Sequence, residues 1–225
     1  MTDPTLSNPP PPDAMARVHL LSAKLYGIVD LGYAPPASLR RVTAQMIEGG
    51  IDVLQLRAKG HARDEIERWA ESLLPVCREA RVPLFINDHP DIAARIGADG
   101  VHVGQDDLSM DEVRALVGDG MLVGRSTHSL AQAEAAAVDP RTDCIGFGPL
   151  FATPTKPGRP AIGLAEIREV HQRHPGLPIF CIGGIKQENL PALVEAGARR
   201  VVIVSGILQA PDIAAYVRAA KALLP

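Results

Sequence analysis

The chain has 225 residues and a net charge of −3, and its apolar (46%) and charged (22%) fractions are those of an ordinary globular protein. This length suits one large α/β domain better than two domains. The slightly acidic balance argues against a nucleic-acid-binding protein, which usually carries a basic face. No apolar stretch is long enough to span a membrane, so we expect neither nucleic acid nor membrane as a partner.

The beginning of the chain is rich in proline, with Pro4 and the run Pro9–Pro12, and has almost no large apolar residues. Such a composition cannot bury enough apolar surface to offset the entropy of ordering. We therefore expect residues 1–20 to be a disordered extension and residues 21–225 to be the catalytic domain. Asp3 and Asp13 make this segment unlike a secretory signal.

From residue 25 onward, short apolar runs typical of strands alternate with amphipathic stretches typical of helices. One helical stretch places Ile66, Leu73 and Cys77 on a single face, and Ser109 with Glu112 form a capping box that begins another. The expected strands are Leu25–Val29, Val53–Leu56, Leu84–Ile86, Gly100–Val103, Leu122–Val123, Cys144–Phe147, Ile179–Ile182 and Val201–Val204.

Eight strands alternating with helices in about 200 residues predict a single-domain (β/α)8 TIM barrel. The alternative is a doubly wound open sheet. That fold would favour a glycine-rich GxGxxG turn after the first strand, but the run Leu25–Val29 continues into Asp30 instead. The pattern therefore favours the barrel.

The three cysteines, Cys77, Cys144 and Cys181, are odd in number and form no CxxC pair. Two of them lie in apolar strand-like runs, so we expect buried free thiols. A protein with this pattern fits the reducing cytoplasm.

In such barrels the active site lies where the strands end and the loops after them begin. Three cations occupy these positions: Arg57 and Lys59 after the second strand and Lys156 after the sixth. Guanidinium and ammonium groups suit a phosphate or pyrophosphate, although each could be an ordinary surface charge.

Carboxylates end two adjacent strands, Asp88 after the third and Asp107 after the fourth. Mg2+ bridging to a phosphate prefers such hard oxygen ligands. Helix capping would also account for both residues, and Asp106 competes with Asp107 for the role of ligand.

Two glycine-containing turns, Gly183–Gly184 after the seventh strand and Ser205–Gly206 after the eighth, match the phosphate site common in these barrels. His128, after the fifth strand, could move a proton near neutral pH or could be a loop histidine bonded to backbone. His102, inside the fourth strand, is expected to be a packed barrel residue.

As a set, these residues resemble the thiamine-phosphate synthase family. The likeness covers nearly the whole expected barrel, and the proline-rich start lies outside it. Seven stretches carry it in order: QLRAK (55–59), INDHPDIA (86–93), GADGVHVGQDD (97–107), GRSTH (124–128), GFGPLFATPTK (146–156), IGGI (182–185) and VSGI (204–207).

The resemblance implies a transferase that joins hydroxymethylpyrimidine pyrophosphate to a thiazole phosphate and releases pyrophosphate. It implies Mg2+ held by Asp88 and Asp107, with Ser126 and Lys156 on the leaving pyrophosphate. The pyrimidine pyrophosphate would contact Gln55, Arg57, Lys59 and Asn87, and the thiazole phosphate would contact Thr153, Thr155, Gly184, Val204 and Ser205. The resemblance thus implies phosphorylated small molecules as partners. It leaves open whether the protein forms a small homo-oligomer.

Two features also resemble the sister family of thiazole tautomerases: Arg125 beside Ser126 with Ser129 after His128, and the loop 157–164. In addition His89 stands where the synthases often have arginine. A tautomerase would use His128 as acid–base on the thiazole carboxylate phosphate and would need no pyrophosphate site. The carboxylates and the 153–156 loop favour the synthase, and they also argue against a non-catalytic phosphate-binding regulator.

Overall fold

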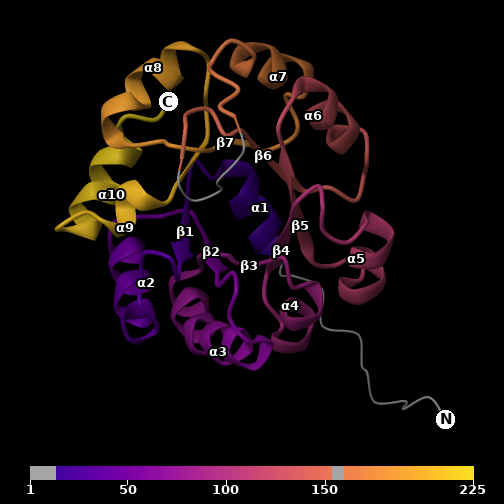
Figure 1. The fold of residues 1–225 in the computed structure, drawn as a ribbon, viewed down its shortest axis with the longest axis vertical. Coiled ribbons are helices and arrows are strands. Elements are labelled where there is room, and N and C mark those ends of the chain that lie inside the picture. The colour runs from indigo at the N-terminus through magenta and orange to yellow at the C-terminus, as the bar shows by residue number, and fades with distance from the viewer. Residues whose placement is uncertain (1–13, 154–159) are drawn as a thin grey trace.

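The computed structural model describes residues 14–153 and 160–225, which form a closed barrel of eight parallel strands ringed by helices (Figure 1). Each strand pairs with its chain neighbours, and β8 closes the barrel on β1. The predicted single-domain (β/α)8 barrel is therefore confirmed. The strands are β1 (Leu25–Asp30), β2 (Val53–Arg57), β3 (Leu84–Asn87), β4 (Gly100–Val103), β5 (Leu122–Thr127), β6 (Cys144–Phe147), β7 (Ile179–Cys181) and β8 (Val201–Ile203).

Helix α5 begins at the capping box that the sequence predicts. The Ser109 hydroxyl accepts from the Glu112 N–H and the Glu112 carboxylate accepts from the Ser109 N–H, which confirms the capping box. The helices are α1 (Ala14–Ser22), η1 (Pro36–Ser38), α2 (Leu39–Glu48), α3 (Arg63–Ala80), α4 (Pro90–Ile96), α5 (Met110–Val117), α6 (Leu130–Ala137), α7 (Ile167–Arg173), η2 (Gln187–Asn189), α8 (Leu190–Glu195), α9 (Ser205–Leu208) and α10 (Ile213–Ala222).

Strand residues alternate between two apolar clusters, as a pleated strand requires. In β1, Leu25 and Val29 face outward and pack with the helices, whereas Tyr26 and Ile28 belong to the cluster inside the barrel. The surrounding helices bury their apolar faces on the outer side. The inner positions are consequently the ones that can line a site.

Helix α1 lies across the amino-terminal ends of the strands, which we call the floor of the barrel. Its residues Ala16 and Leu20 pack with the inward-facing Tyr26, Phe85 and Phe180, and Figure 1 shows the helix in the middle of the ring of strands. The expected disordered extension thus differs from the structure over residues 14–20. That part of the chain does bury apolar surface, because its apolar residues are four positions apart on one helix face. Residues 1–13 lie outside the described residues.

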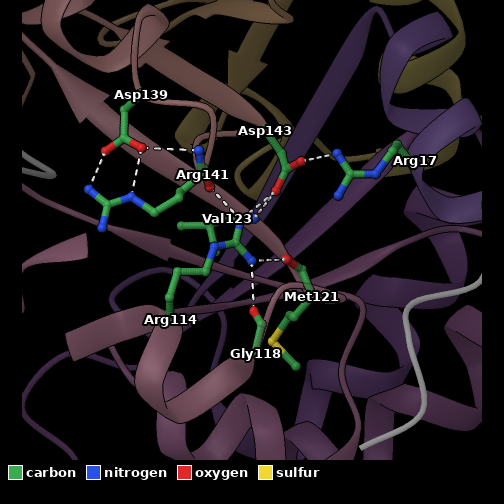
Figure 2. A network of polar contacts seen from close by, with 8 residues as sticks. All are labelled: Arg17, Arg114, Gly118, Met121, Val123, Asp139, Arg141 and Asp143. Carbon is green, nitrogen blue, oxygen red and sulfur yellow. Dashed lines mark hydrogen bonds and ion pairs between the residues drawn. The ribbon is translucent and has the colours of Figure 1, made fainter. Parts of the chain in front are cut away.

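A polar network secures the floor (Figure 2). Arg17 of α1 pairs with Asp143, whose other oxygen accepts from the Val123 N–H at 2.8 Å and from Arg114 at 3.1 Å. Arg114 also donates to the carbonyls of Gly118 and Met121 at 2.9 and 2.7 Å. This network ties α1, α5 and the amino ends of β5 and β6 together.

The three cysteines are free and buried, as predicted. Burial raises the pKa of Cys77 and of Cys181 to about 12, so both are protonated thiols at neutral pH. Among the helices that the structure describes, none is both long and apolar enough to cross a membrane.

Candidate active site

A cavity opens at the carboxyl-terminal ends of the strands, which we call the mouth. It encloses about 920 Å3, part of it continuous with solvent. Side chains from β2, β3 and β5 line one half of the rim, and residues that follow β6, β7 and β8 line the other. The sequence-predicted residues that line it are Gln55, Arg57, Asn87, Ser126, His128, Thr153, Gly184, Val204 and Ser205.

The two site residues of β2 are held by side chains of β1. The Gln55 amide donates to the Tyr26 hydroxyl at 2.9 Å, and Arg57 Nη1 lies 2.7 Å from the Asp30 carboxylate. Burial raises the pKa of Tyr26 well above its usual value, so the phenol stays protonated. Gln55 and Arg57 therefore face the cavity in fixed orientations.

Ser126 and Asn87 reach the cavity from β5 and β3, and both are largely buried. The Ser126 hydroxyl lies 3.1 Å from Nε2 of His102, and the Ser126 carbonyl accepts from the Gln105 amide at 2.6 Å. His102 is thus more than a packed barrel residue, because it lines the cavity and contacts a predicted site hydroxyl.

His128 has the backbone bond that was one of its two expected roles, and its role in moving a proton stays a prediction. Its ring lines the cavity, and Nδ1 is bonded to the Gly148 carbonyl. A carbonyl only accepts, so Nδ1 carries a proton in this arrangement. The His128 N–H donates to the Gln132 side chain at 2.8 Å, which fixes the start of the loop after β5.

The turn after β7 lies against the loop after β6. Gly183 and Gly184 have φ angles of 99° and 64°, which favour glycine. A Cβ on Gly184 would lie 2.8 Å from the Ala152 carbonyl oxygen, so no side chain fits there. This close approach brings Gly184, Thr153 and the start of α9 to one side of the cavity.

The two proposed metal ligands follow β3 and β4 and lie outside the lining of the cavity. Asp88 is half-buried and has a φ of 62°, and its N–H donates to the His102 carbonyl at 2.9 Å. Asp107 is exposed, and its Oδ2 accepts from the Gly104 N–H at 2.6 Å. Within residues 14–153 and 160–225, no group of three or more His, Cys, Asp or Glu side chains could hold a metal ion by itself.

His89, which follows Asp88, is held by Arg63, whose Nη1 lies 3.2 Å from the histidine Nδ1. Burial and the Arg63 charge lower the pKa of His89. At neutral pH the ring is therefore neutral and adds no full positive charge beside Asp88.

The sequence predicted two further cations at the site, Lys59 and Lys156. Lys59 is exposed in the loop after β2 and does not belong to the cavity lining. Thr155 and Lys156 lie outside the described residues, so their predicted roles stay predictions.

The chain is similar to proteins of one family. Residues 25–207 match the family model described as thiamine monophosphate synthase. A thiamine-phosphate synthase of Thermus thermophilus is 45% identical over 192 residues, which cover 85% of this chain and 90% of that protein. A thiamine-phosphate synthase of Pelotomaculum thermopropionicum is 45% identical over 207 residues, or 91% of this chain and 94% of its own length.

Solved structures of other proteins superpose on this chain. The thiamine phosphate pyrophosphorylase from Pyrococcus furiosus superposes with a TM-score of 0.81 at 25% identity and covers 91% of this chain and 96% of its own. A 3-hexulose-6-phosphate synthase superposes with a TM-score of 0.64 at 18% identity, a likeness that concerns the barrel fold alone.

Proposed function

Because the chain belongs to the thiamine monophosphate synthase family, we propose that its mouth cavity binds hydroxymethylpyrimidine pyrophosphate beside a thiazole phosphate. The chain is a transferase of thiamine biosynthesis, which couples a pyrimidine and a thiazole moiety to form thiamine phosphate. The observation that carries the proposal is a single cavity at the mouth, which Gln55, Arg57, Asn87 and Ser126 line from the strands and Gly184 and Ser205 line from the turns after β7 and β8.

The half formed by β2, β3 and β5 receives the pyrimidine pyrophosphate. Gln55 and Asn87 bind the ring and its substituents with amide groups, whereas Arg57 and Lys59 meet the phosphates. A guanidinium can donate two parallel hydrogen bonds to phosphate oxygens, and Asp30 already orients the guanidinium of Arg57.

The opposite half receives the thiazole phosphate. Gly184 and Ser205 offer backbone N–H groups and a hydroxyl, and Thr153 adds a second hydroxyl on the same side of the cavity. Val204 lines this half as well, and the resemblance to the family adds Thr155 as a predicted contact. The thiazole nitrogen would then face the pyrimidine carbon to which it becomes bonded.

The reaction is a dissociative substitution. The bond between the pyrimidine methylene carbon and pyrophosphate breaks, the electron pair leaves with pyrophosphate, and the thiazole nitrogen supplies the pair for the new bond. Ser126, Lys156 and Arg57 donate to the departing oxygens, where negative charge grows. The aminopyrimidine ring stabilises the cation itself, so positioning is the main task left to the protein.

Asp88 and Asp107 fit the site of a Mg2+ ion. They are hard oxygen ligands that follow adjacent strands, and Mg2+ is commonly held by one or two carboxylates with phosphate oxygens and water completing the shell. Two carboxylates match that mode of binding. When bound, the ion neutralises charge on the pyrophosphate.

The partners we propose are phosphorylated small molecules rather than nucleic acid, in line with the net charge of −3. We infer a cytoplasmic location from the three buried free thiols. A small homo-oligomer is compatible with this site.

The direct test is to incubate the purified protein with both phosphorylated substrates and Mg2+ and to measure thiamine phosphate and pyrophosphate in equal amounts. The proposal fails if the protein makes no thiamine phosphate but isomerises the thiazole carboxylate phosphate. Loss of that isomerisation in His128→Asn would then identify a tautomerase.

A further inference from the structure

Arg57 reaches the mouth with its guanidinium already paired. Its Nη1 lies 2.7 Å from Oδ2 of Asp30, and the two side chains are only 12% and 4% exposed. The two residues are directly opposite each other in the register of β1 and β2. The ion pair is therefore a contact between neighbouring strand ends and is largely shielded from water.

Asp30 is itself held rigidly. Its Oδ1 accepts from the Gly32 N–H at 2.8 Å, and its carbonyl accepts from the N–H groups of Tyr33 and Ala34 at 2.9 Å each. The Leu31 N–H donates to the Arg57 carbonyl at 3.0 Å. The carboxylate consequently joins the loop after β1 to the Arg57 side chain.

A buried carboxylate is an unfavourable neighbour for a pyrophosphate unless a cation screens it. Its position is understandable if it orients that cation. A guanidinium has five donors in a rigid plane, so a carboxylate that engages Nη1 fixes the directions of the other donors before a phosphate arrives. Catalytic groups held in this way lose less entropy when the substrate binds.

We propose that Asp30 is a positioning residue, which acts through Arg57 to orient the guanidinium toward the pyrophosphate of the pyrimidine substrate. The proposal rests on the proposed role of Arg57 in this cavity. Asp30 contacts no substrate itself. Its effect should therefore depend on the presence of Arg57 and should concern one of the two substrates.

A double-mutant cycle tests this dependence. In the otherwise unchanged enzyme, Asp30→Asn should lower kcat/KM for the pyrimidine pyrophosphate by about tenfold to a hundredfold, the usual effect of losing a partner that orients a ligand. The KM for the thiazole phosphate should change by less than about twofold, because the residues proposed to bind it lie on the other half of the rim.

In an Arg57→Met background the same substitution should cost nothing or should raise kcat/KM. Without the cation, the Asp30 charge only repels the phosphates, and Asp30→Asn removes that repulsion. A carboxylate that merely stabilises the barrel would not reverse its effect in this way. If Asp30→Asn does not fold, Asp30→Ser, which keeps an acceptor for the Gly32 N–H, takes its place in the cycle.

Asp52 provides a matched control at the floor. Its carboxylate accepts from the Leu25 N–H at 2.9 Å and pairs with Lys221 at 2.6 Å, so it too joins a strand to a cation. Asp52→Asn should lower Tm but should leave kcat/KM for both substrates within about twofold.

The proposal would be overturned if Asp30→Asn lowered kcat/KM by the same factor in the wild-type and Arg57→Met backgrounds. It would also be overturned if Asp30→Asn raised the KM of both substrates equally. The wild-type enzyme in the same assay reports separately on the proposed function. Absence of thiamine phosphate there would contradict the reaction, whereas an additive cycle would contradict only the role of Asp30.

Discussion

At the floor of the barrel, Arg114 donates to three backbone carbonyls and to Asp143, whereas at the mouth Arg57 is held by the Asp30 carboxylate beside an open cavity. Both arginines are largely buried and both pair with an aspartate. At the floor, both Nη groups of Arg114 donate to partners inside the protein. The mouth orients a cation and leaves it facing the space where a phosphate can bind.

The aspartates at the floor and at the mouth also differ in the groups that donate hydrogen bonds to them. At the floor, Asp52, Asp99 and Asp143 each accept an N–H from the first or second residue of the preceding strand: Leu25, Leu84 and Val123 respectively. At the mouth, Asp30 accepts from its own loop and from Arg57. Position along the strand, rather than residue type, thus separates the aspartates that bind strand N–H groups from the one that holds an arginine at the cavity. The following substitutions test that distinction.

The largest effect is expected at the proposed metal ligands. Asp88→Ala should reduce coupling activity on the order of a hundredfold or more, because a phosphate charge is left without its counter-ion. Excess chelator should have the same effect on the wild type, and added Mg2+ should restore it. Full turnover in chelator would contradict the metal assignment.

A comparably large effect is expected at Lys156. Lys156→Ala should lower kcat on the order of a hundredfold and should change the KM for the thiazole phosphate far less, because the proposed contact with pyrophosphate would strengthen as the bond breaks. His128→Asn should cost about tenfold or less, below the usual contribution of a general acid–base. Kinetics of both variants with both substrates check the ranking, and a reversed order would favour the tautomerase.

A smaller effect is expected at Tyr26, which holds Gln55 as Asp30 holds Arg57. Tyr26→Phe leaves a buried amide without its partner, a change that costs about 1–3 kcal/mol of the free energy of unfolding. Because Gln55 then turns more freely, kcat/KM for the pyrimidine pyrophosphate should fall about tenfold. Thermal unfolding and steady-state kinetics measure the two effects. An unchanged kcat/KM would show that Gln55 is oriented by other contacts.

The smallest effect on activity is expected at the floor. Asp143→Asn breaks pairs with Arg17 and Arg114 and should cost about 3–5 kcal/mol of the free energy of unfolding, since a buried cation loses its partner. The folded fraction should keep kcat/KM within about twofold of the wild type. Denaturant titration and kinetics at low temperature separate these effects, and a large loss of kcat/KM would contradict the division between floor and mouth.

The barrel and the strand-end residues were accessible from sequence because both depend on local patterns. Apolar runs such as Gly100–Val103 marked strands, and polar residues such as Arg57 and Ser126 stood where those runs ended. The supporting residues were not accessible in this way. From the sequence alone, Tyr26 and His102 look like core residues, because an apolar pattern does not show which face of a strand points into the barrel.

Contacts between strands were equally hidden. The pair Asp30–Arg57 depends on the register of β1 and β2, and Asp30 appeared in the sequence only as the residue that follows a strand. Helix α1 was missed because a proline-rich neighbourhood masked the short apolar pair Ala16 and Leu20. Its partners inside the barrel come from strands distributed along the whole chain.

The place of α1 has a consequence for the order of folding. Arg17 pairs with Asp143 across 126 positions, and Arg200 donates to the Leu21 carbonyl across 179. Contacts between such distant parts of the chain form late. Leu20 can therefore reach its native packing only after its barrel partners Phe85, Phe180 and Val202 have been synthesised.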